Sequence, residues 1–304
     1  MNTPDFAKTI DVSVRALNFV SENSDLTSAL TVKHGNDNSH ALGLGLMGLH
    51  GLFALNEMEY GSDESLELTD LIFRTIRFYA LKTSNQIAKE KQSTYKDFEL
   101  SQYYDGSFFE QYITGNLRFK GFRHQKNAEL FKNIPIPTEE DWKALSHDVK
   151  EYGLYNKYLL TVAPTGSISY INEATASLHP ITNLIEERQE KKTGKTYYPA
   201  PYLSNKTLPY YKSAYDIDMR KVIDVYATAQ AHVDQSMSLT LFMRSELPEG
   251  MYEWKEGRTN KMTTRDLNIL RHYAWRKGIK SIYYIRTFTP DGEAERAVCE
   301  SCSV

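Results

Sequence analysis

A short apolar run, Tyr158 to Val162, leads directly into the small polar segment Ala163-Pro164-Thr165-Gly166-Ser167-Ile168-Ser169. The run has the length and residue types of a buried strand, so the segment after it is predicted to be a turn at a strand end. Ligands of α/β proteins bind at that position. Gly166 allows close approach of the backbone, and Thr165 and Ser167 supply hydroxyl and N–H groups of the kind that line a phosphate-sized hollow. On local sequence alone, a plain strand-ending turn is the simpler interpretation.

The rest of the chain alternates predicted helices and strands. Apolar periodicity and capping residues predict helices over residues 4–22, 64–90, 138–152, 219–235 and 263–275. Strands are predicted over 158–162, 238–243 and 279–287, and the charged stretch 186–195 is expected to be a solvated loop or a hairpin arm. This alternation is typical of a parallel α/β architecture, and no repeat or linker divides it.

A glycine-rich segment early in the chain matches a dinucleotide-binding pattern by spacing alone. Gly43, Gly45 and Gly48 fit G-x-G-x-x-G. The pattern requires a hydrophobic strand before it, whereas the residues that precede it, 34–40, are polar and are expected to form a loop. A buried helix over 41–55, whose glycines admit a neighbouring segment, is therefore favoured over a dinucleotide site.

The composition excludes several classes of protein. The 304 residues include 36 Lys and Arg against 39 Asp and Glu, for a net charge of −3, and no sustained basic stripe. This argues against direct binding of nucleic acid. No apolar run reaches the length of a membrane span, and the N-terminus lacks the layout of a signal peptide. We therefore expect a cytoplasmic protein without a membrane partner.

The two cysteines, Cys299 and Cys302, form a C-x-x-C pair within six residues of the C-terminus. A closed zinc site would need two further ligands, and the eight histidines do not cluster in ligand spacing, so no metal site is predicted. Thiol–disulfide exchange is the favoured chemistry for the pair. The cysteines would lie on a mobile tail, residues 288–304, that follows a single domain spanning residues 1–287.

Two other groups of residues have roles that the sequence alone does not decide. Tyr283 and Tyr284 lie inside the last predicted strand, near its exit. Strand periodicity would send one ring to the core and the other to the surface, while two adjacent rings at a strand exit are also suited to passing an electron and a proton. His232 and Asp234 fall on the predicted helix 219–235 and do not face the same way, so His232 is expected to be a buried, hydrogen-bonded group.

Six separated motifs occur in one order along the chain. They are Val162-Ala163-Pro164-Thr165-Gly166-Ser167-Ile168-Ser169-Tyr170-Ile171-Asn172, Tyr197-Tyr198-Pro199-Ala200-Pro201-Tyr202, His232-Val233-Asp234-Gln235 with Ser238-Leu239-Thr240-Leu241-Phe242, Tyr273-Ala274-Trp275-Arg276-Lys277-Gly278-Ile279-Lys280, Tyr283-Tyr284-Ile285-Arg286, and the terminal Cys-x-x-Cys. This set resembles the C-terminal part of the large, catalytic subunit of class I ribonucleotide reductases, most closely the class Ib branch of bacteria and phages. The resemblance runs from about residue 3 to the end.

The resemblance implies roles for three groups of residues. Pro164 to Ile168 would hold the diphosphate of a ribonucleoside diphosphate. Tyr283 and Tyr284 would be a stacked pair that relays a radical between subunits. Cys299 and Cys302 would reduce the active-site disulfide and be reduced in turn by a thioredoxin- or glutaredoxin-like protein. The fifteen residues from Thr287 to Cys302 span up to about 50 Å when extended, which is long enough for that exchange.

The resemblance also implies missing parts. Complete members carry an upstream finger loop with the thiyl-radical cysteine, two further reducing cysteines and an allosteric nucleotide site, whereas no cysteine precedes Cys299 here. The expected fold is α/β, the C-terminal half of a ten-stranded barrel that is incomplete in this chain. A separate N-terminal large-subunit fragment would complete it, and a small subunit would supply a dimetal-tyrosyl radical, so no cofactor is expected on this chain. A non-catalytic remnant that binds nucleotide or the small subunit is the alternative.

The incomplete barrel that the resemblance implies would also affect the stability of the chain. Half of a barrel would expose apolar surface that normally faces the other half. We therefore expect low stability or aggregation when this chain is expressed alone.

Overall fold

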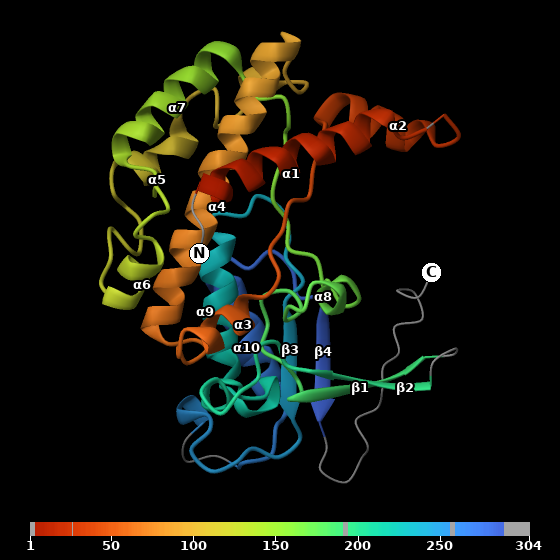
Figure 1. Ribbon diagram of the computed structural model, residues 1–304, viewed down its shortest axis with the longest axis vertical. Coiled ribbons are helices and arrows are strands. Elements are labelled where there is room, and N and C mark those ends of the chain that lie inside the picture. The colour runs from red at the N-terminus through yellow and green to blue at the C-terminus, as the bar shows by residue number, and fades with distance from the viewer. Residues whose placement is uncertain (1–3, 26, 191–193, 256–258, 289–304) are drawn as a thin grey trace. The chain divides into compact units, whose positions relative to one another are not determined.

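The computed structural model describes residues 4–25, 27–190, 194–255 and 259–288 (Figure 1). These residues form two compact units. The first takes its residues from 1–46, 63–163 and 228–236, and the second from 47–62, 164–227 and the described part of 237–304. Cys299 and Cys302 lie outside the described residues.

The first unit is helical. It contains α1 (Pro4–Asn23), α2 (Leu30–Ser39), α4 (Asp63–Lys91), α5 (Glu110–Ile113), α6 (Gln125–Leu130) and α7 (Glu139–Tyr152), with 3-10 turns at Phe98–Leu100 and Ser107–Phe109. The second unit contains α3 (Leu49–Leu55), α8 (Ile168–Ile171), β1 (Ile185–Glu190), β2 (Gly194–Pro199), most of α9 (Met219–Gln230), β3 (Thr240–Arg244), α10 (Thr264–Arg276) and β4 (Tyr284–Phe288), with 3-10 turns at Leu208–Tyr210, Ala214–Asp216 and Glu253–Lys255.

The long helix α4 is the core of the first unit and packs against α1, α6 and α7. Its predicted bounds are confirmed to within a residue at each end. Two of its basic side chains are buried, since Arg74 and Arg77 are only 5% and 1% exposed. On α7, Trp142 stacks on Tyr112 with ring centroids 3.9 Å apart and meets the edge of Phe78. A helix buried on nearly every side needs partners for such internal charges.

The predicted helix at the N-terminus is confirmed as α1, which buries one line of side chains. Ile10, Val14 and Asn18 are buried at steps of four, whereas Phe19 and Val20 are 66% and 62% exposed. Val20 is two residues beyond Asn18, and two residues rotate a helix by about 200°, which sends its side chain away from the buried line.

The predicted polar loop over residues 34–40 is wrong, since residues 34–39 belong to α2. Polar side chains four residues apart bond to one another or to the backbone along this helix. Lys33 pairs with Asp37 at 2.5 Å, and the hydroxyl of Ser39 donates to the carbonyl of Gly35 at 2.6 Å. These bonds give a polar segment helical support, and the helix ends at His40, whose φ of 43° is left-handed.

The glycine-rich segment is a helix only from Leu49, where α3 begins. Gly43 and Gly45 lie in an extended segment beside Thr161. A Cβ added to Gly45 would come within 2.5 Å of the carbonyl oxygen of Thr161, and one added to Gly43 would come within 2.7 Å of the Thr161 methyl group. The prediction that these glycines admit a neighbouring segment is confirmed, whereas the helix predicted over 41–48 is wrong.

In the second unit, β3 and β4 lie side by side and are parallel, with α10 between them in the sequence (Figure 1). Thr263 caps α10 through a capping box with Asp266, as Thr138 caps α7 with Asp141, so both predicted caps are confirmed. Within the charged stretch 186–195, residues 186–190 lie in β1 and residues 194–195 in β2 of an antiparallel hairpin, which confirms the hairpin-arm alternative.

The described strands make a mixed α/β architecture, and the predicted strand over 158–162 is not part of either two-stranded sheet. Leu160 instead forms an isolated parallel bridge with Leu44 inside the first unit. Over the ranges that the structure covers, the strands do not close into a barrel. In the same ranges, no helix combines the length and the apolar character needed to cross a membrane.

Candidate active site

The second unit contains a cavity of about 820 Å³. Its lining includes the turn that begins at Pro164, the segment from Glu173 to Asn183, the hairpin β1–β2 with the residues after it, and one face of β3 and β4. Thr240 and Phe242 of β3 and Tyr284 and Arg286 of β4 line it at alternate positions, as strand periodicity requires. Residues that are more than one hundred positions apart in the sequence therefore meet at one cavity.

The turn after Ala163 has a conformation that its own side chains stabilise. Thr165 has a left-handed φ of 50°, and its hydroxyl accepts a hydrogen bond from the backbone N–H of Ser177 at 2.7 Å. Ser177, also left-handed with a φ of 50°, places its hydroxyl 3.2 Å from that of Ser238. A Cβ added at Gly166 would meet no protein atom within 4 Å. The backbone at Gly166 therefore borders open space at the rim of the cavity.

The five predicted substrate-binding residues do not all face this cavity. Pro164 and Gly166 line it, whereas Thr165, Ser167 and Ile168 are not among its lining residues. Thr165 uses its hydroxyl to hold Ser177, and Ser167 and Ile168 are exposed where α8 begins.

The two predicted relay tyrosines both line the same cavity. Their ring centroids are 4.1 Å apart, with the planes inclined by 56°. Their expected place at the strand exit is wrong, because Tyr284 begins β4 and Tyr283 precedes it. The backbone N–H of Tyr283 donates to the carbonyl of Leu239 at 2.7 Å, which fixes the start of the strand. Since Tyr283 lies outside the strand, the two rings are not forced onto opposite faces.

Two arginines and two glutamates bring charge to the cavity. Arg188 of β1 and Arg286 of β4 are the cations, and Glu173 and Glu186 are the carboxylates. Neither arginine was predicted from the sequence. The available signal for Arg188 was the alternation of Glu186 and Arg188, which places both on one face of a strand. The arginines give the cavity groups that bind anions.

A partly buried histidine also lines the cavity and was not predicted. The Nδ1 of His179 lies 3.2 Å from the carbonyl oxygen of Pro180, and its ring meets the edge of Phe242. Burial lowers the pKa of His179 to about 4, and the positive charge of Arg286 acts in the same direction, against the hydrogen bond to Pro180. The imidazole is therefore neutral near pH 7, and its Nδ1–H donates to the Pro180 carbonyl.

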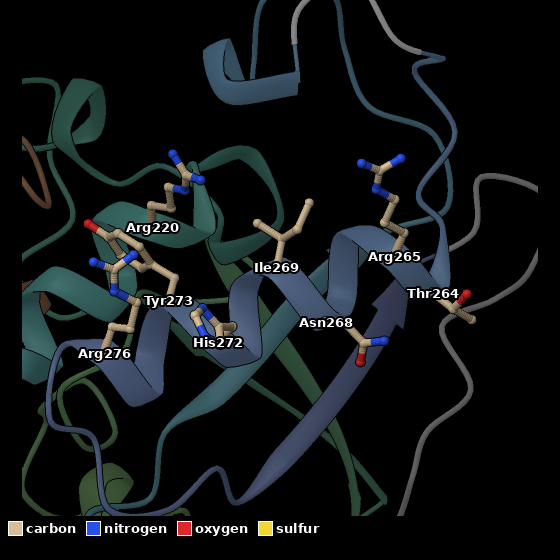
Figure 2. Close-up of a pocket in the computed structure, with 8 residues that line it drawn as sticks. All are labelled: Arg220, Thr264, Arg265, Asn268, Ile269, His272, Tyr273 and Arg276. Atoms are coloured by element: carbon tan, nitrogen blue, oxygen red, sulfur yellow. The ribbon is translucent and has the colours of Figure 1, made fainter.

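A second cavity of about 630 Å³ lies on the outer face of α10 (Figure 2). Arg265, His272 and Arg276 of α10 line it, together with Arg220 near the start of α9. The guanidinium of Arg220 lies over the rings of Trp254 and Tyr273, at 4.7 and 5.0 Å from their centroids. This groove has a basic lining and shares no lining residue with the first cavity.

His232 in the first unit is a buried, fully bonded group, as expected. Its Nδ1 lies 3.0 Å from the hydroxyl of Tyr112, and its Nε2 lies 3.0 Å from a carboxylate oxygen of Asp70. Both ring nitrogens therefore have partners inside the protein, which favours a structural role over metal ligation. Within the described ranges, no three His, Cys, Asp or Glu side chains gather in a way that would hold a metal ion.

The prediction that Asp234 lies on a helix is wrong, because α9 ends at Gln230. Its carboxylate pairs with Arg77 at 2.6 Å and accepts the backbone N–H groups of Leu159 and Leu160 at 2.9 and 2.8 Å. This bonding gives the buried charge of Arg77 a partner and holds the segment that precedes the Pro164 turn in the sequence.

Together, these features define a mixed α/β protein with a cavity lined by a polar turn, two arginines and a tyrosine pair. A family model described as "Ribonucleotide reductase, barrel domain" matches residues 1–285. The chain therefore belongs to the ribonucleotide reductase large-subunit family.

Curated relatives agree with this assignment. The chain is 41% identical to the ribonucleoside-diphosphate reductase subunit alpha of Bacillus subtilis over 297 residues, covering 98% of the chain and 39% of the relative. It is 38% identical to the subunit of the same name from Mycoplasma pneumoniae, covering 99% of the chain and 41% of the relative. Identity to the nrdEB subunit alpha of Bacillus phage SPbeta is 39%, over the whole chain and 26% of the relative. The chain thus spans well under half the length of these relatives.

Proposed function

We propose that this chain is the C-terminal part of the catalytic subunit of a class Ib-like ribonucleoside-diphosphate reductase, which reduces ribonucleoside diphosphates to the deoxyribonucleotides needed for DNA synthesis. The observation that carries the proposal is the shared cavity, which is lined by the Pro164 turn and by Tyr283 and Tyr284. Family membership supports the same chemistry.

The substrate diphosphate lies against residues Pro164 to Ile168 in this proposal. The open space beside Gly166 leaves room for phosphate oxygens near the backbone. Arg188 and Arg286 offset the negative charge of the ligand within the same cavity.

Tyr283 and Tyr284 relay the radical. In each step, one tyrosine gives up the hydrogen atom of its hydroxyl, as a proton and an electron, to the neighbouring phenoxyl radical and becomes the radical itself. The centroid distance of 4.1 Å between the two rings supports such a step. The radical originates at the dimetal-tyrosyl centre of a small subunit, and this chain binds no cofactor of its own.

The cysteine that forms the thiyl radical belongs to the N-terminal part of a large subunit, which also carries the nucleotide effector site. That part completes a ten-stranded barrel, to which residues 1–287 contribute about half. Phe288 ends β4, so the proposed tail is residues 289–304. The active site replaces the ribose 2′-hydroxyl by hydrogen, releases water and oxidises two thiols to a disulfide. Cys299 and Cys302 then reduce that disulfide by exchange and become a disulfide themselves.

A reconstitution assay tests this proposal. The chain is combined with an N-terminal large-subunit fragment, a radical-bearing small subunit and dithiothreitol, and conversion of CDP to dCDP is measured. We expect turnover only when all three protein components are present. If the complete set assembles but remains inactive, the chain is a non-catalytic remnant that binds nucleotide or the small subunit.

The tail dithiol gives a separate prediction. In the assembled enzyme, Cys302→Ser should still permit a limited first turnover with dithiothreitol but should abolish turnover driven by a thioredoxin- or glutaredoxin-like protein, because exchange needs both thiols. Ser303→Ala is the matched control and should behave like the unsubstituted enzyme. Full turnover of Cys302→Ser with the protein reductant would contradict the role of the tail.

A further inference from the structure

Arg188 of the hairpin lies against the turn that lines the cavity. Its Nη2 donates to the carbonyl oxygen of Gly166 at 3.4 Å, and its guanidinium lies 4.1 Å from the centre of the Tyr170 ring. Gly166 belongs to the turn and Tyr170 to α8, which follows it directly. The arginine is half-buried and is itself a lining residue of the cavity.

The hairpin orients Arg188 through strand periodicity and through a second bond to α8. Glu186 and Arg188 are two residues apart on β1 and both line the cavity, while Glu187 between them pairs with Lys195 of β2 at 2.7 Å. The hydroxyl of Tyr170 donates to the Glu186 carboxylate. Burial, and then the bond to Glu186, raises the pKa of Tyr170, so its hydroxyl remains protonated and continues to donate. Tyr170 therefore links the helix after the turn to the strand that carries Arg188.

We propose that Arg188 binds the diphosphate of the substrate directly, and that Tyr170 and Glu186 are positioning residues that hold its guanidinium over the turn. The proposal rests on the proposed function, since it assumes a diphosphate at the Pro164 turn. A guanidinium carries five N–H donors in a planar fork, so it can hold the Gly166 carbonyl and still donate two parallel bonds to a phosphate.

The other cation of the cavity occupies a different place. Arg286 lies on β4 two residues after Tyr284, and its guanidinium carbon is 5.7 Å from the centre of that ring. It is thus associated with the tyrosine pair, whereas Arg188 contacts the turn itself. For this reason Arg188 is the cation that meets phosphate oxygens bound at the turn.

Equilibrium binding to the chain assembled with an N-terminal large-subunit fragment tests this role, with CDP and cytidine as probes. Arg188→Gln should weaken CDP binding about tenfold to a hundredfold, the loss typical of a charge-assisted bond, and leave cytidine binding unchanged. Arg188→Lys should recover part of the loss, because a lysine keeps the charge but not the fork. Lys195→Gln removes a cation from the same hairpin that does not line the cavity, and it should leave both affinities unchanged.

A double-mutant cycle tests the positioning residue. Tyr170→Phe keeps the ring under Arg188 and removes only the hydroxyl, and it should weaken CDP binding about threefold to tenfold. In the Arg188→Gln background, the same substitution should have no further effect on CDP binding, because the two residues act through one contact. An equal effect of Tyr170→Phe in both backgrounds would overturn the positioning role.

The outcomes separate this inference from the proposed function. If the unsubstituted chain binds CDP and Arg188→Gln binds it equally well, the role of Arg188 is overturned while the diphosphate site stands. If Arg188→Gln weakens CDP and cytidine alike, or lowers the unfolding midpoint, the arginine supports the fold and does not bind phosphate. If the unsubstituted chain binds cytidine and CDP with equal affinity, the diphosphate site and this inference both fail.

Discussion

Asp234 shows how one side chain fixes local structure in an irregular segment. It lies beyond the end of α9, yet its carboxylate has three short contacts, with Arg77 and with the backbone N–H groups of Leu159 and Leu160. Arg77 is 1% exposed, so its charge has no access to water to replace this partner. An uncompensated buried charge is far more costly than a lost surface pair.

We predict that Asp234→Ala lowers the free energy of unfolding by about 3–5 kcal/mol, because it leaves Arg77 buried without its carboxylate. Arg15 is the matched control, since its side chain is 37% exposed and pairs with Glu90 at 2.9 Å on the surface. Arg15→Ala should cost less than about 1 kcal/mol. Urea unfolding of the three proteins measures the difference, and equal losses for both variants would contradict the account.

At the scale of elements, the sequence predicted what depends on near neighbours. Periodicity gave α1 and α4, and Thr138 and Thr263 gave the starts of α7 and α10, because capping involves residues three positions apart. The segment 158–162 was predicted as a strand in the main sheet, but it pairs with Leu44, about 115 positions earlier in the chain. Pairing between residues so far apart depends on the tertiary fold, and local sequence patterns do not predict it.

The approach of Gly45 to Thr161 gives a prediction at this scale. A Cβ at Gly45 would come within 2.5 Å of a backbone oxygen that cannot move alone, so Gly45→Ala should cost about 1–3 kcal/mol of unfolding free energy. Gly35 in α2 has no protein atom within 4 Å of an added Cβ, and Gly35→Ala should stabilise the chain by about 0.5–1 kcal/mol. Chemical denaturation measures the unfolding free energy of both variants. Changes of the same sign in the two variants would contradict this prediction.

At the scale of the whole chain, the candidate site was only partly predictable. The motif set pointed to the Pro164 turn and to the tyrosine pair, and the structure places both at one cavity. Arg188 and His179 were missed, because nothing in the sequence indicates that the hairpin packs over the turn or that a histidine after it lines the same cavity. The bond from the backbone N–H of Ser177 to the Thr165 hydroxyl was also not predicted, because it joins residues twelve positions apart.

Two histidines of the second unit, His50 and His179, make its stability depend on pH. Nδ1 of His50 accepts the backbone N–H of Ile181, and its Nε2–H donates to the carbonyl of Tyr210, so the bonds require the neutral ring. Burial lowers the pKa of both His50 and His179 to about 4, against 6.5 for an exposed histidine. The unfolded chain therefore binds protons below pH 6.5 that the folded chain does not bind until about pH 4.

The free energy of unfolding should thus fall as the pH decreases from about 6 to 5, by about 1.4 kcal/mol per pH unit for each histidine, and this loss should level off below about pH 4. His50→Gln and His179→Gln should each reduce the dependence of the unfolding free energy on pH. Urea unfolding at closely spaced pH values measures this dependence. A flat profile between pH 6 and 5 in the unsubstituted chain would mean that neither histidine is held neutral.

We propose that this chain carries both the diphosphate site and the radical relay of a reductase at one cavity. The most direct test of this proposal compares Tyr284→Phe with Tyr197→Phe, an exposed tyrosine that does not line the cavity, in the reconstituted enzyme. We predict that Tyr284→Phe abolishes conversion of CDP to dCDP while CDP affinity and subunit assembly are unchanged, because phenylalanine has no hydroxyl hydrogen to transfer, and that Tyr197→Phe retains full turnover. Undiminished turnover of Tyr284→Phe would contradict the proposal.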